Sequence, residues 1–240
     1  MKRIDKSKFI KLDELTCKVQ NDPAFENLYG HGMYVEILQS IKEQLDAILS
    51  HCEEVRVYRF DLRAAKDTCL PSDNRTASTF IKRLTAKIHR IKKDTQLRYI
   101  WVREQANNNT NQHYHFVLCL DAKLYLSRKQ LKALVTSLEH SLGVSVRWSK
   151  AHDKQPNTGL PAFKKLRAIN TSANKKAYLE EIFRLSYLAK VRTKDNCLRS
   201  DKTNDYHSSK AKAKTDSSWW PYVDEKQTLT TKLFDTINNS

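Results

Sequence analysis

The segment from Gln112 to Asp121 has an apolar side chain at every second position, and this alternation limits the possible fold more than any other feature. Every second side chain is apolar: Tyr114, Phe116, Leu118 and Leu120. Because successive side chains of a β-strand point to opposite faces, this set predicts a strand with one face in a core. His113 and His115 then lie together on the other face.

The surrounding sequence predicts a regular series of elements from its apolar periodicity. In chain order these are a helix over 34–49, a strand over 56–63, a helix after the turn at 71–74, strands over 97–105 and 112–121, a helix ending at Gly143 and a strand over 144–148. After the first helix the order is β-α-β-β-α-β. We therefore expect an α+β fold with a ferredoxin-like antiparallel sheet, helices on one face and an open face that can hold a catalytic site.

The remaining sequence suggests three segments. Residues 1–52 form an N-terminal arm and helix, 53–200 the main domain, and 201–240 a basic linker with a C-terminal appendage. Inside the main domain, 106–111 is expected to be a hairpin loop. The region 150–170 is expected to be a loop with a short strand near 166–169, and another helix starts near Asn174.

The chain is strongly basic, with 43 Lys and Arg against 27 Asp and Glu and a formal net charge of +16. Such an excess favours a polyanionic partner, and nucleic acid is the first choice, although anionic membranes attract the same surface. No apolar run approaches the roughly 20 residues that span a bilayer. We therefore expect no membrane partner and a cytoplasmic protein.

Two histidines on one strand face can bind the same metal ion. Glu104 precedes His113 by nine residues, and antiparallel pairing of the two positions would complete a site of two imidazoles and one carboxylate. Such a site leaves coordination positions free, and its mixed ligands suit Mg²⁺ or Mn²⁺. Asp61 is a second candidate for the acidic ligand, but it can also pair with Arg59 or Arg63. Surface polarity is the alternative explanation of the histidine pair.

The helix predicted from Asn174 carries a candidate nucleophile. Tyr187 falls on its charged side, and Lys190 follows one turn later. A phenolate can attack phosphorus while a nearby ammonium stabilises the developing charge. An ordinary tyrosine on a solvated basic helix is the alternative.

Three segments together resemble the motifs of the HUH endonucleases of rolling-circle replication: Arg59–Arg63, His113–Leu118 and Ser186–Lys190. The surrounding sequence, with Trp101–Glu104, Trp148 and Phe183–Lys190, is similar to the YagK/YfjJ branch of inovirus-type replication proteins. The resemblance covers roughly residues 53–200.

The resemblance implies that His113, His115 and an acidic residue bind the metal, Tyr187 is the nucleophile and Lys190 assists at the phosphate. Members cleave one strand, keep its 5′ end as a phosphotyrosine and release a 3′ hydroxyl. The implied partners are single-stranded or hairpin origin DNA and, since the sequence has no helicase P-loop motif, a host helicase and polymerase, with no small-molecule substrate. Six basic residues near the motifs are expected to contact DNA: Arg59, Arg63, Arg103, Arg184, Arg192 and Lys194.

Two other functions remain open at this point. One is a non-catalytic nucleic-acid-binding regulator, and the other is a relaxase or transposase with the same chemistry. An RNA-recognition sheet would expose aromatic side chains on its central strands. Here Tyr114 and Phe116 point to the predicted core while the histidines take the other face, which favours the nuclease.

Overall fold

The computed structural model describes residues 9–10, 33–104, 112–124, 126–149, 161–168, 171–190, 203–210 and 213–214. The helices are α3 (Val35–Leu49), α4 (Arg75–Ile91), α5 (Arg128–Leu142) and α6 (Ser172–Ser186), with 3₁₀ turns η1 (Ala122–Leu124) and η2 (Tyr187–Ala189). The strands are β1 (Phe9–Ile10), β2 (Met33–Tyr34), β3 (Glu54–Ala64), β4 (Leu97–Glu104), β5 (His113–Asp121), β6 (Val144–Trp148), β7 (Phe163–Arg167) and β8 (Tyr206–Ser208). Each helix and strand predicted between residues 34 and 148 is confirmed.

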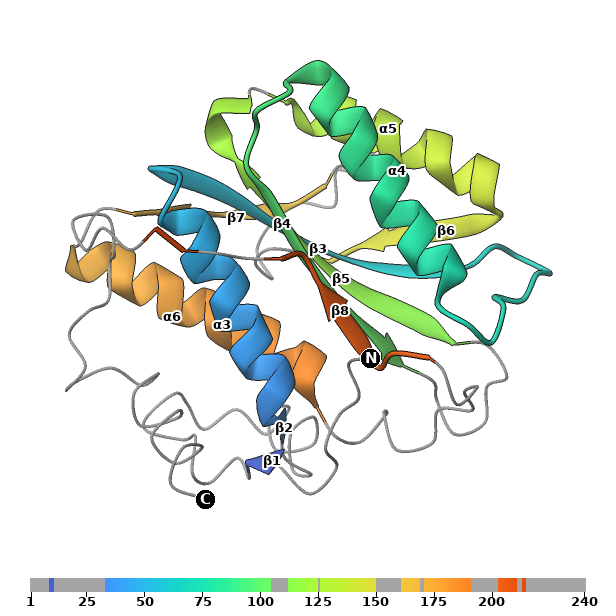
Figure 1. Cartoon of the computed structure of the whole chain (residues 1–240), viewed down its shortest axis with the longest axis horizontal. Helices are drawn as coiled ribbons and strands as arrows, with labels where there is room; N and C mark the ends of the chain where they lie inside the picture. The colour runs from blue at the N-terminus through green and yellow to red at the C-terminus, as the bar shows by residue number, and fades with distance from the viewer. Residues whose placement is uncertain are drawn as a thin grey trace.

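An antiparallel sheet lies at the centre, with strands in the order β6-β3-β5-β4-β8 (Figure 1). The long strand β3 also pairs with β7, because its first half opposes β7 and its second half opposes β6. The alternation in β5 places Phe116 against Phe60 of β3, with ring centroids 5.1 Å apart and the planes stacked. The α+β class and the antiparallel sheet are therefore as predicted.

Helices cover both faces of the sheet, so the predicted open face is wrong. α4 and α5 lie on one side, over the apolar residues of β5 such as Phe116 and Leu118. α3 and α6 lie on the other side, where α3 packs on Val57, Val102 and Val117 (Figure 1). The physical reason is that β3, β4 and β5 carry apolar residues on their second face too, and burial of that surface requires a cover.

Local signals at the ends of α5 explain its sharp boundaries. The side chain of Ser127 accepts a hydrogen bond from the Gln130 backbone, and the Gln130 side chain accepts one from the Ser127 backbone, which forms a capping box. Gly143 follows the helix with φ 61°, a left-handed conformation that glycine adopts at little cost. The chain can therefore reverse at once into β6.

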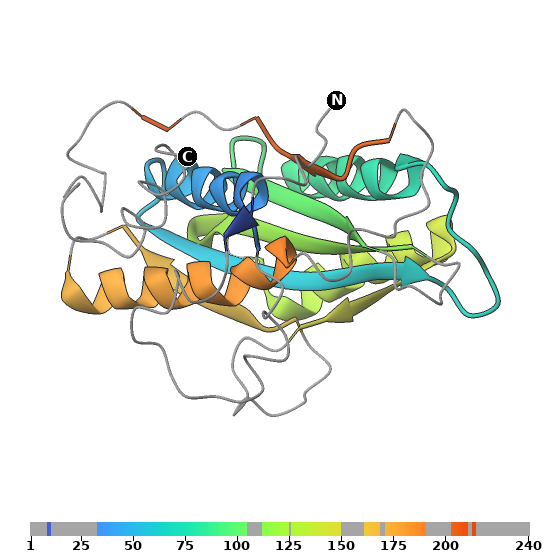
Figure 2. The same ribbon diagram turned by 90° about the horizontal axis from the view of Figure 1, so that it is seen from below.

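The segment 203–210, which contains β8, differs from the linker expected after residue 200. β8 pairs with β4, where Val102 opposes Tyr206, and Tyr206 is buried in the core beside α3. Asn74 donates to the backbone of Asn204, and Gln44 donates to that of Ser209, so the segment runs along α3 and α4 (Figure 2).

Other expectations are refined or lie outside the described residues. The short strand expected near 166–169 is β7, which begins earlier, at Phe163. The hairpin loop expected at 106–111 and most of the 150–170 loop fall outside the described residues. Over the described part of the chain, every helix is too short or too polar to span a bilayer.

Candidate metal and nucleophile site

Three neighbouring strands bring acidic and imidazole side chains together on the α3/α6 side of the sheet. Glu104 of β4 is the register partner of His113 of β5, as the sequence predicted. On the other side of β5, Asp61 of β3 is the register partner of His115. Because cross-strand partners have closely spaced Cβ atoms, these four side chains gather at one end of the sheet.

Glu104, His113 and His115 form a compact group that can hold one metal ion. Nε2 of His113 lies 3.1 Å from Oε2 of Glu104, and Nε2 of His115 contacts the same oxygen. One potential ligand atom from each residue lies within 4.8 Å of the others. Glu104 and His115 are each 2% exposed, so two of the three groups are already removed from water. Two nitrogens and a carboxylate oxygen fit a divalent cation with coordination positions left for water or phosphate.

Asp61 contacts His115 on the side of the ring away from Glu104. Its Oδ1 lies 2.6 Å from Nδ1 of His115, and its Oδ2 pairs with Arg63 at 3.2 Å. Burial acts to raise the pKa of Asp61, but the hydrogen bond and charge of His115, with Arg59 and Arg63, outweigh it and lower the pKa to about 2. The ionised carboxylate only accepts hydrogen bonds, so Nδ1 carries a proton and Nε2 faces the metal group. Asp61 therefore positions His115, while Glu104 is the acidic member of the metal group.

Tyr187 and Lys190 reach this group from the far end of the chain. The α-helix ends at Ser186, and a 3₁₀ turn over Tyr187–Ala189 leads to Lys190. Nζ of Lys190 donates to the Tyr187 hydroxyl at 2.6 Å. The same Nζ lies 3.4 Å from Oε1 of Glu104. The Tyr187 ring also packs edge-on against His115, with centroids 5.6 Å apart.

Packing against α3 fixes the position of this turn. Leu185, Leu188 and Ala189 are fully buried in the core that α3 and α6 share. Farther along α6, the hydroxyl of Tyr178 donates to Asp46 of α3. Burial raises the pKa of Asp46 above its ordinary value. Tyr178 is thus a core residue, as its place on the apolar side of the helix predicted.

The basic residues expected to contact DNA have different environments. Arg59 lies over the Tyr187 ring, with its guanidinium carbon 4.2 Å from the centroid. Arg63 pairs with Asp61. Arg184 makes a bidentate pair with the buried Glu181.

Arg103 does not share this site. Its side chain is 2% exposed and points to the opposite face of β4 from that of Glu104. Arg103 therefore offers no surface to DNA in this structure. Arg192 and Lys194 lie outside the described residues.

Two features of the site were missed from the sequence. The stacking of Arg59 on Tyr187 joins distant segments, and no local pattern predicts it. The buried position of Asp46 was not predicted either, because α3 contains three acidic residues and the sequence does not distinguish Asp46 from Glu36 and Glu43.

Known proteins resemble this chain in sequence over most of its length. The chain is 27% identical over 192 residues to "Uncharacterized protein YfjJ" of Escherichia coli (strain K12), which covers 68% of this chain and 90% of that protein. A solved hydantoinase/carbamoylase family amidase from Burkholderia ambifaria matches 40% of this chain and 27% of its own at 16% identity. The TM-score of that match is 0.26. Residues 20–202 match the YagK/YfjJ C-terminal domain, so the protein belongs to the YagK/YfjJ C-terminal domain family.

Proposed function

We propose that the protein is an HUH-type endonuclease that nicks single-stranded origin DNA to start rolling-circle replication. The observation that carries the proposal is the meeting of Tyr187 and Lys190 with the Glu104–His113–His115 group. A phenol, an ammonium and a candidate metal group, contributed by two strands and a helix end, are the parts that a metal-assisted tyrosine nuclease requires.

The reaction would proceed by in-line displacement at phosphorus. The Tyr187 oxygen forms a bond to phosphorus, the bond to the 3′ oxygen breaks, and the 3′ oxygen takes up a proton to leave as a hydroxyl. The phenolic proton passes to solvent. The product is a 5′-phosphotyrosine and a free 3′ hydroxyl that can prime synthesis, and the reverse attack rejoins the strands.

The side chains around Tyr187 support this assignment. Lys190, with its Nζ 2.6 Å from the phenolic oxygen, places a positive charge beside the reacting groups, where it can stabilise the charge that develops during the attack. Arg59 stacks on the ring and holds its plane in place. Mg²⁺ or Mn²⁺ bound by Glu104, His113 and His115 would supply Lewis-acid polarisation of the scissile phosphate.

The arrangement of the sheet supports the finer fold assignment that accompanies this proposal. We assign β3-α4-β4-β5-α5-β6 to a ferredoxin-like unit, since its strands follow the order β6-β3-β5-β4 with both helices on one face. In this assignment, α3, α6, β7 and β8 are additions. α3 and α6 form a second cover and bring the nucleophile to the histidine face.

The test is formation of a covalent adduct. The protein is incubated with labelled single strands of random sequence and Mg²⁺ or Mn²⁺, and denaturing gels are read for protein-linked label. We expect an adduct with the unaltered protein and with the control Tyr99→Phe, which changes a tyrosine on the α4/α5 side. Tyr187→Phe and His113→Ala should give none.

Two results would overturn the proposal. An adduct that survives Tyr187→Phe would exclude Tyr187 as the nucleophile. Strand binding with no adduct in either metal would favour the non-catalytic regulator instead. A host helicase and polymerase remain the expected protein partners of the nicked product, and the bacterial cytoplasm remains the expected compartment.

A further inference from the structure

In the described structure, a group of cationic side chains without acidic partners lies away from the proposed nicking centre, on the outer side of α4 and α5. α4 contains five Lys and Arg and no acidic residue, and α5 contains three Lys and Arg and one acidic residue. That acidic residue, Glu139, accepts a hydrogen bond from the backbone of Val146 at 2.6 Å, so its carboxylate is bound to β6.

We define the outer basic face by the six residues Lys82, Arg83, Lys87, Arg90, Lys129 and Lys132. All but the partly exposed Lys87 are exposed. Within the described part of the chain, none of the six lies within 4.0 Å of an acidic group. By contrast, Arg63 and Lys190 beside the proposed nicking centre, and Arg184 of α6, are all paired with carboxylates.

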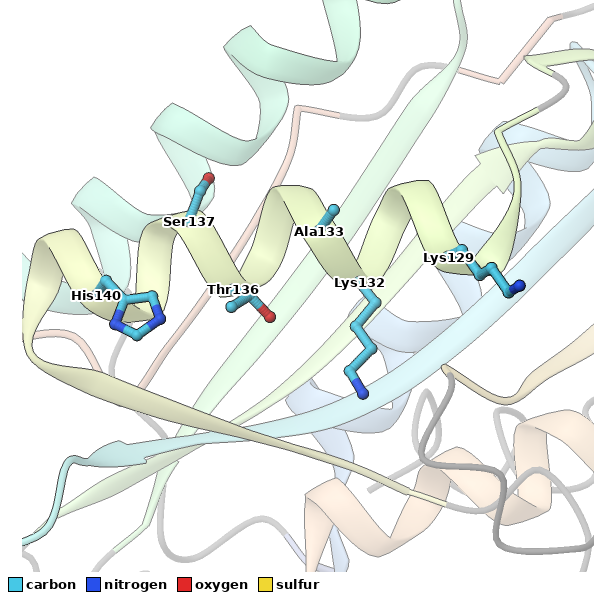
Figure 3. A pocket seen from close by; sticks show the side chains of 6 residues that line it. All are labelled: Lys129, Lys132, Ala133, Thr136, Ser137 and His140. Carbon is cyan, nitrogen blue, oxygen red and sulfur yellow. The ribbon is translucent and has the colours of Figure 1, made fainter.

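The two helices present these residues together. α4 and α5 pack side by side on the same face of the sheet (Figure 1), and Leu84 and Leu131 both belong to the core beneath them. An open hollow runs along the outer side of α5, lined by Lys129, Lys132, Ala133, Thr136, Ser137 and His140. Figure 3 shows the side chains of Lys129 and Lys132 extending away from the helix.

We propose that the outer basic face binds the phosphate backbone of double-stranded DNA next to the strand that is nicked. Unpaired cationic side chains release counterions from a polyanion without first breaking an internal ion pair. Proteins that hold single strands stack the bases on aromatic side chains. The only Phe, Tyr or Trp of α4 and α5 is Phe80, which is fully buried, so this face suits a duplex read through its backbone.

This inference rests on the proposed function only for the identity of the polyanion as DNA. It gives the two sides of the sheet different tasks. The α3/α6 side holds the strand that reacts, and the α4/α5 side holds the flanking duplex without regard to its sequence.

The test compares two variants that remove the same number of charges. The first is Lys82→Gln, Arg83→Gln, Lys129→Gln and Lys132→Gln on the outer basic face. The control is Lys123→Gln, Lys164→Gln, Lys165→Gln and Arg167→Gln, whose side chains are paired with Glu53, Glu180 and Glu54. Fluorescence anisotropy measures binding to a labelled duplex of about 20 base pairs over a range of salt, with chelator present so that no cleavage occurs.

We expect the first variant to lose roughly tenfold or more in duplex affinity near 0.1 M salt, and its salt slope to fall by about 0.9 for each contact removed. The control should keep the slope of the unaltered protein. An equal loss in both variants, or none in the first, would overturn the inference. Tighter binding of the outer basic face to a single strand or RNA than to duplex DNA would also overturn it.

Failure of the two proposals can be told apart. Adduct formation on a short single strand should be unchanged in the first variant, and duplex binding should be unchanged in Tyr187→Phe. If no adduct forms but the duplex pattern holds, only the nicking proposal fails. If the adduct forms but the four substitutions leave duplex binding intact, only this inference fails.

Discussion

Lys190 donates a hydrogen bond to the hydroxyl of Tyr187 across 2.6 Å while it also pairs with Glu104 at 3.4 Å. The lysine thereby connects the candidate nucleophile to the carboxylate of the candidate metal group. It is 7% exposed, so both interactions operate with little competition from water. Tyr187 precedes Lys190 in the short turn that follows α6, whereas Glu104 belongs to β4.

Replacement of Lys190 should slow strand cleavage. Lys190→Gln removes the positive charge beside the reacting groups, and we expect a single-turnover rate about 10²- to 10³-fold lower. Lys190→Arg should recover part of the rate. Affinity for the single strand should stay close to that of the unaltered protein, as measured by anisotropy. A cleavage rate that is unchanged in Lys190→Gln would remove Lys190 from the mechanism.

Asp61→Asn should weaken metal binding without removing a ligand. The change takes away the carboxylate that holds the protonated Nδ1 of His115, and loss of such a supporting group costs about 10- to 100-fold in metal affinity. Titration calorimetry with Mn²⁺ measures the effect. Asp73→Asn is the matched control, since the carboxylate of Asp73 forms its ion pair with the exposed Arg75, away from the histidine group. Equal affinities in both variants would contradict the assignment.

Metal should stabilise the folded chain through the histidine group. A ligand present at about 100 times its dissociation constant adds roughly 2.7 kcal/mol to the free energy of unfolding. Thermal melts should therefore shift upward with Mn²⁺ in the unaltered protein and return on addition of chelator. His113→Ala should show no such shift. A rise of the same size in that variant would mean that Mn²⁺ binds elsewhere.

The buried Asp46 should make stability depend on pH. Its pKa in the folded chain is raised from 3.8, chiefly by burial, so the folded state holds the proton more tightly than the unfolded state. Its contribution is therefore fully present below pH 3.8 and is lost as pH rises through the folded pKa. Asp46→Asn has no such group and keeps an oxygen that can accept from Tyr178.

Urea unfolding at a series of pH values tests this expectation. The free energy of unfolding of Asp46→Asn, relative to that of the unaltered protein, should increase from acid toward neutral pH. A relative free energy that decreases over the same range would show that the ion pair with Lys42, rather than burial, dominates the environment of Asp46.

The sequence predicted the elements and part of the site because their signals are local. Alternation in β5 put His113 and His115 on one face, and the nearby strand 97–104 could place Glu104 opposite His113 only in one antiparallel register. Spacing alone also put Lys190 one turn from Tyr187. Gly143 marked the end of α5 because the left-handed residue after a helix is usually glycine.

The covering of the second face could not be predicted in the same way. The apolar stripe of α3 shows that the helix is buried, but it carries no information about which surface buries it. The environments of two basic residues, by contrast, follow from their positions in the sequence. Arg103 neighbours Glu104 on a strand and must point away from it, and Arg184 lies three residues after Glu181 on one helix face.

The short strand β8 has a practical consequence for anyone who works with fragments of this chain. It covers the outer side of β4, where the backbone of Arg103 also donates to Asp205. A fragment that stops at residue 202, where the family match ends, would leave that row of backbone groups exposed along Ile100 to Arg103. Bare strand edges recruit other chains, so such a fragment should aggregate, and a well-behaved one should extend beyond residue 210.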